Sequence, residues 1–251
     1  MSPGTVCPSD VFAVVTDPAG GGKGKVAKFV LRKNYERSEV RAQQNGRPRI
    51  ASDPPVELWY GWRLYLPSDF DPTMDTNPKA NHIIVTQWHQ DNTTSFYDGA
   101  PTVVRINNDN TWRLNLKYQP DLSVESITSH SFNLGSINSH KGKWTNFVMH
   151  VKWTKNLDGF LRLWMNGRQV IGGGRAAHQW ENKPTFWDTP KGVGFKMGMY
   201  KGDPWTQGQS PKVIYADDYR LGNARARYED VAPGNASLQP DARIRRRGVS
   251  K

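Results

Sequence analysis

The chain is poor in cysteine and in long apolar runs, and each absence excludes a class of protein. A single cysteine, Cys7, allows no intrachain disulfide and no metal cluster built on several thiolates. No apolar stretch approaches the roughly 20 residues of a transmembrane helix, so we expect no membrane partner. The first residues also lack the basic region and apolar run of a secretory signal. Helical periodicity is missing too, since no long segment repeats its apolar residues every 3.6 positions.

The chain is nevertheless rich in aromatic residues and in positive charge. Its 251 residues include ten Trp, nine Tyr and nine Phe, too many for a disordered chain. The formal net charge of +11 favours a polyanionic partner, and nucleic acid, anionic lipid and acidic polysaccharide all qualify. Four arginines and a lysine crowd the last nine residues, which we expect to form a flexible tail. The charge on the predicted strands is therefore the more informative part.

Short segments with two-residue alternation indicate β-structure. The clearest is 56–66, where every second residue from Val56 to Leu66 is apolar and Pro67 ends the pattern. Further strands are expected over residues 11–15, 25–30, 35–41, 82–90, 102–107, 111–119, 144–153, 159–165, 169–171, 193–200 and 213–221, and a polar loop between 119 and 144. Turns rich in Gly, Pro, Asn and Asp favour antiparallel pairing. We therefore predict an all-β fold, an antiparallel β-jelly roll (concanavalin-like sandwich) with a concave groove over residues 1–225, followed by the basic tail over 226–251.

One of these strands, 82–90, ends in an unusual polar pair. Gln87 and His89 are two residues apart, so they project from the same face of the strand. That face is either merely wet and polar or the floor of a site. Two other strands carry charged or hydrogen-bonding groups in the same register: Arg37, Glu39 and Arg41 on one, and Lys196 and Tyr200 on the other. In a curved antiparallel sheet, the three faces would line one groove.

This set of groups suits a uronic acid polymer and its cleavage by β-elimination. The proton at C5 of a uronate becomes acidic only when the neighbouring carboxylate is neutralised, which Gln87 and an arginine such as Arg37 can do. His89 titrates near neutral pH, and Lys196 is expected to lower the pKa of Tyr200 by favouring phenolate. In glucuronate, H5 and O4 lie on the same side of the ring. Tyr200 can then act as base and acid, with His89 polarising the carboxylate, or the two can share the proton transfers.

Three short motifs resemble the signature strands of the jelly-roll polysaccharide lyases, which include the alginate lyases. They are Arg37-Ser38-Glu39-Val40-Arg41, Gln87-Trp88-His89 and Phe195-Lys196-Met197-Gly198-Met199-Tyr200. Residues 144–170 and Trp59-Tyr60-Gly61-Trp62 resemble more closely the branch of heparin lyase I and glucuronan lyase, and the similarity covers roughly residues 10–222. The resemblance implies that Gln87 neutralises the carboxylate, that His89 is the catalytic histidine and that Tyr200 is the acid or base.

The resemblance also implies substrate-binding roles for Arg37, Arg41 and Lys196, and we add Glu39, Arg105 and Lys117 as further substrate-binding residues. The first tyrosine of the third alginate motif is Gly194 here, and its alanine is Met197, which weakens alginate as the substrate. We therefore expect a polysaccharide lyase that cleaves glucuronan, a β-1,4-linked glucuronate polymer, to unsaturated ends. A heparin-like or alginate lyase and a non-catalytic carbohydrate-binding jelly roll are the alternatives. A glycoside hydrolase would need paired carboxylates, and the groove offers only Glu39.

The remaining expectations concern metals, partners and location. No cofactor is required for the chemistry, but the relatives bind a structural calcium, to which Asp217 and Asp218 are candidate ligands. The partner is expected to be an anionic polysaccharide and not nucleic acid. We expect a monomer, secreted or periplasmic. The other histidines are interpreted as structural or exposed, and strict alternation turns His82 away from the face of His89.

Overall fold

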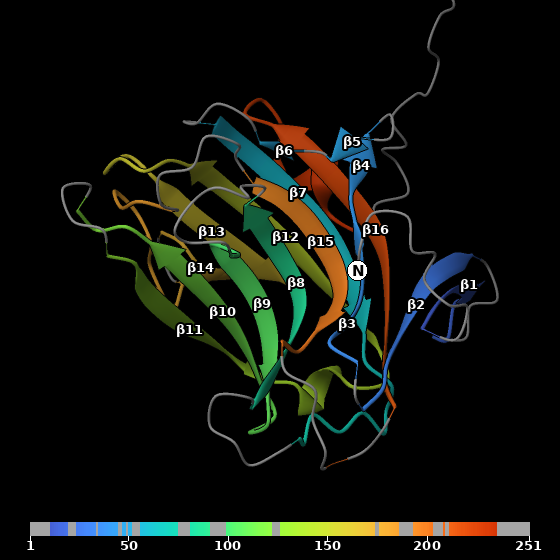
Figure 1. The fold of residues 1–251 in the computed structure, drawn as a ribbon. Helices are drawn as coiled ribbons and strands as arrows, with labels where there is room; N and C mark the ends of the chain where they lie inside the picture. The colour runs from blue at the N-terminus through green and yellow to red at the C-terminus, as the bar shows by residue number, and fades with distance from the viewer. Residues whose placement is uncertain are drawn as a thin grey trace, which may run out of the picture.

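The protein is almost entirely β-structure in two antiparallel sheets (Figure 1). The computed structural model describes residues 11–19, 24–33, 35–44, 47–48, 50–51, 56–74, 81–90, 99–121, 126–173, 176–185, 193–202, 208 and 211–234. Each sheet has seven strands, and the prediction of an all-β jelly roll is confirmed. No helix among the described residues is long and apolar enough to cross a membrane.

The first sheet contains the first and the last strands of the chain, with β1 at one edge and β16 in the interior. Its order is β1 (Phe12–Thr16), β2 (Lys25–Leu31), β16 (Lys212–Asn223), β7 (Val56–Tyr65), β12 (Trp144–Trp153), β13 (Phe160–Met165) and β14 (Arg168–Ile171). The turn from β13 to β14 passes through Asn166 and Gly167, which both have the positive φ of a tight hairpin turn.

The second sheet brings together strands from distant parts of the chain. Its order is β11 (Thr128–Ser136), β10 (Thr111–Tyr118), β9 (Thr102–Asn107), β8 (His82–Gln90), β15 (Val193–Tyr200) and β3 (Arg37–Arg41), and β6 (Ile50–Ala51) also pairs with β15. Two more short strands, β4 (Gln43–Gln44) and β5 (Arg47–Pro48), pair with each other. Strand β11 lies where the sequence predicted a polar loop. That prediction was wrong because an edge strand needs little apolar surface, and within β11 Phe132 is the one buried residue.

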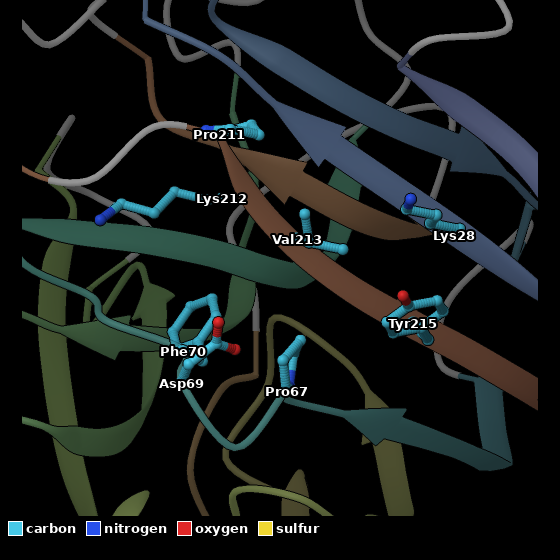
Figure 2. A pocket seen from close by; sticks show the side chains of 8 residues that line it. All are labelled: Lys28, Pro67, Asp69, Phe70, Pro211, Lys212, Val213 and Tyr215. Carbon is cyan, nitrogen blue, oxygen red and sulfur yellow. The ribbon is translucent and has the colours of Figure 1, made fainter. Parts of the chain in front are cut away.

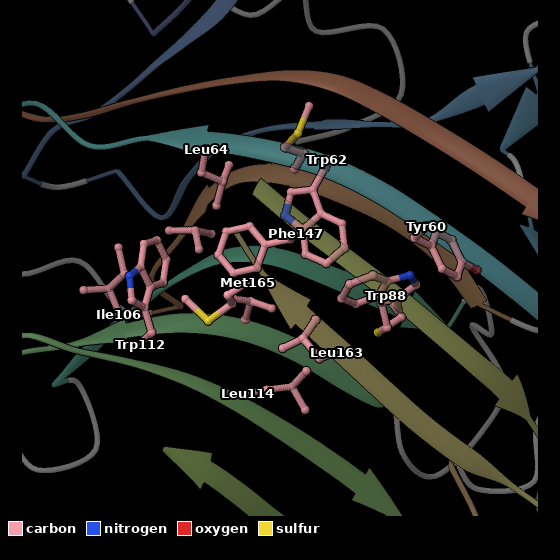
Figure 3. Packing of buried hydrophobic residues seen from close by; sticks show 14 of the residues in the cluster. Tyr60, Trp62, Leu64, Trp88, Ile106, Trp112, Leu114, Phe147, Leu163 and Met165 are labelled. Carbon is pink, nitrogen blue, oxygen red and sulfur yellow. The ribbon is translucent and has the colours of Figure 1, made fainter. Parts of the chain in front are cut away.

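Large aromatic side chains from both sheets fill the space between them (Figure 3). Trp62 of β7 stacks on Phe147 of β12 with ring centroids 5.1 Å apart, and it meets the edge of Trp88 from β8 at 5.3 Å. All three rings are completely buried. Because a ring of this size removes roughly 150–250 Å² from water, each contributes several kcal/mol to holding the sheets together.

A β-bulge in β8 determines which side chains of that strand face the core and which face outward. The pairing with β9 shifts register between Ile84 and Thr86, and Ile83, Val85 and Trp88 all reach the core. One extra residue therefore lies on the inner side, and His82 ends on the same outer face as Gln87. The sequence expectation that His82 and His89 face opposite ways was wrong, because strict alternation does not survive a bulge.

Two short helices complete the described chain, the 3-10 helix η2 (Asn138–His140) and α1 (Tyr228–Val231). Helix α1 covers the outer face of the first sheet, where Val231 is 1% exposed and packs with Val148 and Trp59. Residues 228–232 thus belong to the folded unit, although we placed the start of the tail at residue 226. The rest of the predicted tail, from residue 235, lies outside the described residues.

Candidate active site

The three predicted motif strands are immediate neighbours in the second sheet, in the order β8, β15 and β3. Lys196, in the middle strand, pairs with Gln87 on one side and Arg41 on the other. Toward the start of β15, Gly194 pairs with His89 of β8. At the end of β15, Tyr200 pairs with Arg37 of β3. The register therefore brings the predicted residues onto one continuous face, with Gln87 between His89 and Tyr200 along the strands.

Glu39 is the centre of the polar contacts on this face. Its side chain is only 8% exposed, and Oε2 accepts a hydrogen bond from Gln87 Nε2 at 2.6 Å. Lys196 Nζ lies 3.6 Å from Oε1, and Arg37 Nη1 lies 3.5 Å from the same oxygen. A carboxylate can only accept hydrogen bonds, so the nitrogen of Gln87, and not its oxygen, must face Glu39. Glu39 thereby fixes which way the buried amide points.

Two cations flank this contact. Burial lowers the pKa of Lys196, the positive charges of Arg37 and Arg41 lower it further, and Glu39 opposes them. The guanidinium of Arg37 lies over the ring of Tyr200, 4.7 Å from its centroid. A cation–π contact at a half-exposed site is worth about 0.5–1 kcal/mol, enough to favour one position of the ring. Arg37, Lys196 and Tyr200 are thus connected in space as well as in sequence pattern.

Glu39 and Gln87 lie two strands apart, and a glycine makes their contact possible. Neighbouring strands are about 4.8 Å apart, so Glu39 must cross β15 to reach β8. Its pairing partner on β15 is Gly198, with φ +135°, where an added Cβ would lie 2.5 Å from the Cα of Glu39 and 2.3 Å from the oxygen of Ser38. Glycine at 198 provides both the backbone conformation and the room for this crossing.

The same face continues over β9 and β10. Arg105 of β9 pairs with Ile84 and with Arg113 of β10, and burial followed by the charge of Arg113 lowers its pKa, against the effect of Asp109. Arg113 is held by Asp109 at 3.3 Å. Lys117 is exposed at the far end of β10, where it pairs with Ser129 of β11. Arg105 therefore adjoins the three motif strands, whereas Lys117 lies out toward the sheet edge.

A family model described as "Polysaccharide lyase" matches residues 7–220. The chain belongs to this polysaccharide lyase family. A search of curated protein sequences finds no match.

Solved structures share the fold of the lyase. An endo-β-1,4-glucuronan lyase from the fungus Trichoderma reesei superposes with a TM-score of 0.65 at 21% identity, covering 90% of each chain. An alginate lyase from Pseudomonas aeruginosa gives 0.55 at 15% identity, over 86% of this chain and 87% of the other. An alginate lyase from Chlorella virus gives 0.53 at 15% identity, over 84% and 88%. At these identities the likeness shows a common fold, in agreement with the predicted jelly roll.

The outer face of β3, β15, β8, β9 and β10 is the candidate active face, and two of its residues were not among the predicted site residues. His82 was interpreted as structural, yet it shares the face with Arg105, and burial, then Arg105 and Lys201, lower its pKa to about 4. Arg113 was noted only as part of an alternating strand, although it lies directly across from Arg105. Arg113 could have been predicted from the register of β9 and β10. His82 could not, because strict alternation along the strand does not allow for the bulge.

The predicted calcium ligands lie on the first sheet and are already engaged. Asp217 accepts a hydrogen bond from Arg63, and Asp218 accepts one from Arg220 at 3.2 Å and one from the backbone of Gly234 at 3.0 Å. Among the described residues, no group of three or more His, Cys, Asp or Glu side chains could hold a metal ion. Two carboxylates neutralised by guanidinium groups do not fit a calcium ion. Asp217 and Asp218 are therefore poor candidates for calcium ligands, and calcium binding elsewhere in the protein stays a prediction.

A pocket of about 260 Å³ lies elsewhere, on the first sheet (Figure 2). It is lined by Lys28, Pro67, Asp69, Phe70, Pro211, Lys212, Val213 and Tyr215. The buried ammonium group of Lys212 already has hydrogen-bond partners here, because Nζ donates to the carbonyl oxygens of Asp71 and Thr73 at 2.6 and 2.7 Å. None of the predicted catalytic residues lines this pocket, so it is separate from the candidate site on the outer face of the second sheet.

Proposed function

We propose that this lyase cleaves glucuronan by β-elimination on the face formed by β8, β15 and β3. The observation that carries the proposal is the buried Gln87 amide, 2% exposed, whose orientation Glu39 fixes next to two cationic side chains. The net charge of +11 and the fold shared with a fungal glucuronan lyase support an anionic glucuronate polymer. Gly194, in place of the tyrosine of the alginate motif, also favours glucuronan over alginate.

The first step is neutralisation of the substrate carboxylate. A primary amide has two N–H groups, and Glu39 takes one of those of Gln87. The second N–H donates to the substrate carboxylate, and Arg37 supplies positive charge beside it. Such fixed donors stabilise the negative charge that develops when C5 loses its proton, an effect commonly worth 10²–10³ in rate per donor.

The proton transfers are assigned to Tyr200, with His89 as a further partner of the carboxylate. The phenolate of Tyr200 removes H5, the electron pair forms the C4=C5 double bond, and the bond from C4 to O4 breaks. Tyr200 then returns the proton to O4 of the leaving chain. One group performs both transfers because H5 and O4 of glucuronate lie on the same side of the ring.

The test is a panel of polymers that separates the substrate from the chemistry. Glucuronan, alginate and heparin-like polymers are incubated with the lyase, and the ultraviolet absorbance of the new double bond is followed. We expect the fastest rise with glucuronan. A faster rise with another polymer would reassign the substrate, and binding without any unsaturated product would refute elimination altogether.

We also propose that the lyase acts outside the cytoplasm and as a monomer. A large polysaccharide does not enter a cell before it is cleaved, so its lyase must meet it outside. Fractionation of the source cells checks the location, and sedimentation of the purified protein checks the monomer. Lyase activity confined to the cytoplasmic fraction would contradict the proposed location, and a sedimenting dimer would contradict the proposed monomer.

A further inference from the structure

The pocket on the first sheet takes no part in the proposed elimination, yet it is lined by charged and aromatic groups. Two of them, Lys28 of β2 and Tyr215 of β16, are direct pairing partners, and the next residues on their strands, Phe29 and Ile214, belong to the core. Because side chains alternate between the two faces of a strand, Lys28 and Tyr215 project from the outer face. The pocket therefore lies on the side of the sandwich opposite to the candidate active face.

The walls of this pocket are held in place by contacts within the protein. On one wall, the ring of Tyr215 meets the edge of the Tyr65 ring, with centroids 5.7 Å apart. On the other wall, the backbone N–H of Phe70 donates to the carbonyl oxygen of Pro67 at 3.0 Å, which closes a turn that carries Asp69. A site whose walls are already ordered loses little conformational entropy when a ligand binds.

Two opposite charges line the pocket without a partner. Within the part of the chain that the structure describes, neither the Lys28 ammonium nor the Asp69 carboxylate makes a hydrogen bond or an ion pair. Burial, then Tyr65 and Asp69, raise the pKa of Tyr215, so its phenol stays neutral and can donate. Asp69 and Tyr215 lie on opposite sides of the pocket, with Val213 between them (Figure 2). The pocket thus combines a cation, an anionic acceptor, a neutral donor and an aromatic ring.

We propose that this pocket is a second, non-catalytic binding site of the lyase that takes a single uronate unit of the polysaccharide. The choice of a uronate rests on the proposed function. A hexuronate has its carboxylate on one side of the ring and free hydroxyls on the other. The carboxylate pairs with Lys28, the hydroxyls donate to Asp69, and the apolar face of the sugar packs against Tyr215.

The size of the pocket agrees with one sugar unit. Its volume of about 260 Å³ is slightly below the roughly 300–1,000 Å³ of sites that take drug-sized ligands. A ligand of about 13 non-hydrogen atoms, such as glucuronate, binds such a site with a Kd on the order of 1 mM. Affinity of this order is useful only where uronate units are concentrated, as they are in a polysaccharide gel.

A second site on the opposite face allows the lyase to hold one chain while it cleaves another. Attachment raises the effective concentration of the enzyme at an insoluble substrate without any new contact in the catalytic site. A short soluble oligomer gives no such advantage, because it does not keep the enzyme near further substrate. The site should therefore affect the cleavage of insoluble polymers alone.

The binding test is a titration of the lyase with D-glucuronate, followed by the backbone amide signals in NMR spectra. We expect the signals of Lys28, Asp69 and Tyr215 to shift with a Kd on the order of 1 mM, and Lys28→Ala to weaken this binding about tenfold. Lys25→Ala is the matched control, since it removes the same charge from an exposed position of the same strand outside the pocket. Its affinity should equal that of the wild type. Glucose, which has no carboxylate, should bind about tenfold more weakly than glucuronate.

The functional test compares an insoluble polyuronate gel with short soluble oligomers of the same polymer. Lys28→Ala should release unsaturated ends from the gel about two- to tenfold more slowly than the wild type, because a millimolar site meets millimolar uronate there. Its kcat and KM on the oligomers should not change. Lys25→Ala should match the wild type on both substrates, and both variants should keep the melting temperature of the wild type.

Three results would overturn the inference while leaving the proposed function in place. They are pocket signals that glucuronate does not shift, a loss of binding in Lys25→Ala as large as in Lys28→Ala, and equal rates of Lys28→Ala and wild type on the gel. A wild type that produces no unsaturated ends from any polyuronate would instead overturn the proposed function. The titration with glucuronate does not depend on cleavage, so the two failures are distinguishable.

Discussion

Glu39→Gln is the substitution that most directly tests the polar network of the candidate active face. It keeps the size of the side chain and its ability to accept from Gln87, but it removes the negative charge beside Lys196 and Arg37. At 3.6 Å the attraction between Glu39 and Lys196 is about 4–5 kcal/mol for the effective dielectric constant of about 20 that suits protein sites. The contribution of Arg37 is smaller, because its side chain is 35% exposed and screened by water.

The net loss of stability is smaller than this attraction, because Lys196 can give up its proton. We expect Glu39→Gln to lower the free energy of unfolding by about 2–4 kcal/mol at neutral pH. The pKa of Lys196 is lower in the folded protein than in the unfolded chain. Its contribution to the free energy of unfolding is therefore fully present above the unfolded pKa of 10.5 and is lost as pH falls through the folded pKa. Without Glu39 that pKa falls further. The loss of stability caused by Glu39→Gln should therefore shrink as pH rises toward 10.5, because the neutral form of Lys196 is not attracted to Glu39.

Denaturant unfolding across this pH range measures the deficit, and steady-state kinetics measures the catalytic effect. We expect kcat to fall about tenfold or more, because loosening a catalytic group by ~1 Å costs up to about 100-fold. KM should not rise, since the variant is more positive toward a polyanion. Glu57→Gln is the control: it breaks a carboxylate contact to His150 at 2.7 Å on the other sheet, and should cost stability without changing kcat. A deficit independent of pH, or a kcat equal to that of the wild type, would refute the reasoning.

Three further predictions follow from single contacts. Tyr200→Phe should abolish formation of unsaturated ends while the melting temperature changes little, and an active variant would rule out Tyr200 as the acid and base. His82 has a pKa of about 4 against 6.5 when unfolded, so its contribution is present above pH 6.5 and lost as pH falls toward 4. The difference corresponds to about 3.4 kcal/mol and to roughly half of that after allowance for solvent screening, so His82→Gln should reduce the loss of free energy of unfolding between pH 6.5 and 4 by that halved amount, as measured by denaturant unfolding. Lys212→Met should lower the free energy of unfolding by about 2–4 kcal/mol, because two carbonyl oxygens lose their donor. Denaturant unfolding checks this, and a neutral effect would contradict it.

The strands could be predicted where each strand's own residues decide its structure. Residues 56–66 have an apolar residue at every second position, and β7 runs from Val56 to Tyr65 as expected. The hairpin of β9 and β10 formed around Asn108-Asp109-Asn110, where Asn110 has the positive φ that such turns require. In both cases the side-chain pattern or the turn residue carries the information locally.

The contacts that organise the candidate active face could not be predicted in the same way. The hydrogen bond from Gln87 to Glu39 joins residues 48 positions apart and passes over a third strand. It depends on the pairing of Gly198 with Glu39, which no local pattern specifies. The bulge in β8 has no sequence signal either, since every residue from Ile83 to Val85 is apolar. Motif resemblance identified the residues, whereas the register of three strands determines what they touch.

The charge balance of this face shows what the substrate contributes to it. Strands β3, β8, β9 and β15 carry one carboxylate, Glu39, against four cationic side chains, which are Arg37, Arg41, Arg105 and Lys196. Crowded like charges destabilise the folded protein, and burial already lowers the pKa of Lys196 and of Arg105. A bound polyanion offsets that repulsion in the folded state alone. It should therefore raise the melting temperature, by an amount that grows with ligand concentration and declines with salt. Neutral polysaccharides of the same length should leave it unchanged, because they bring no charge to the cations.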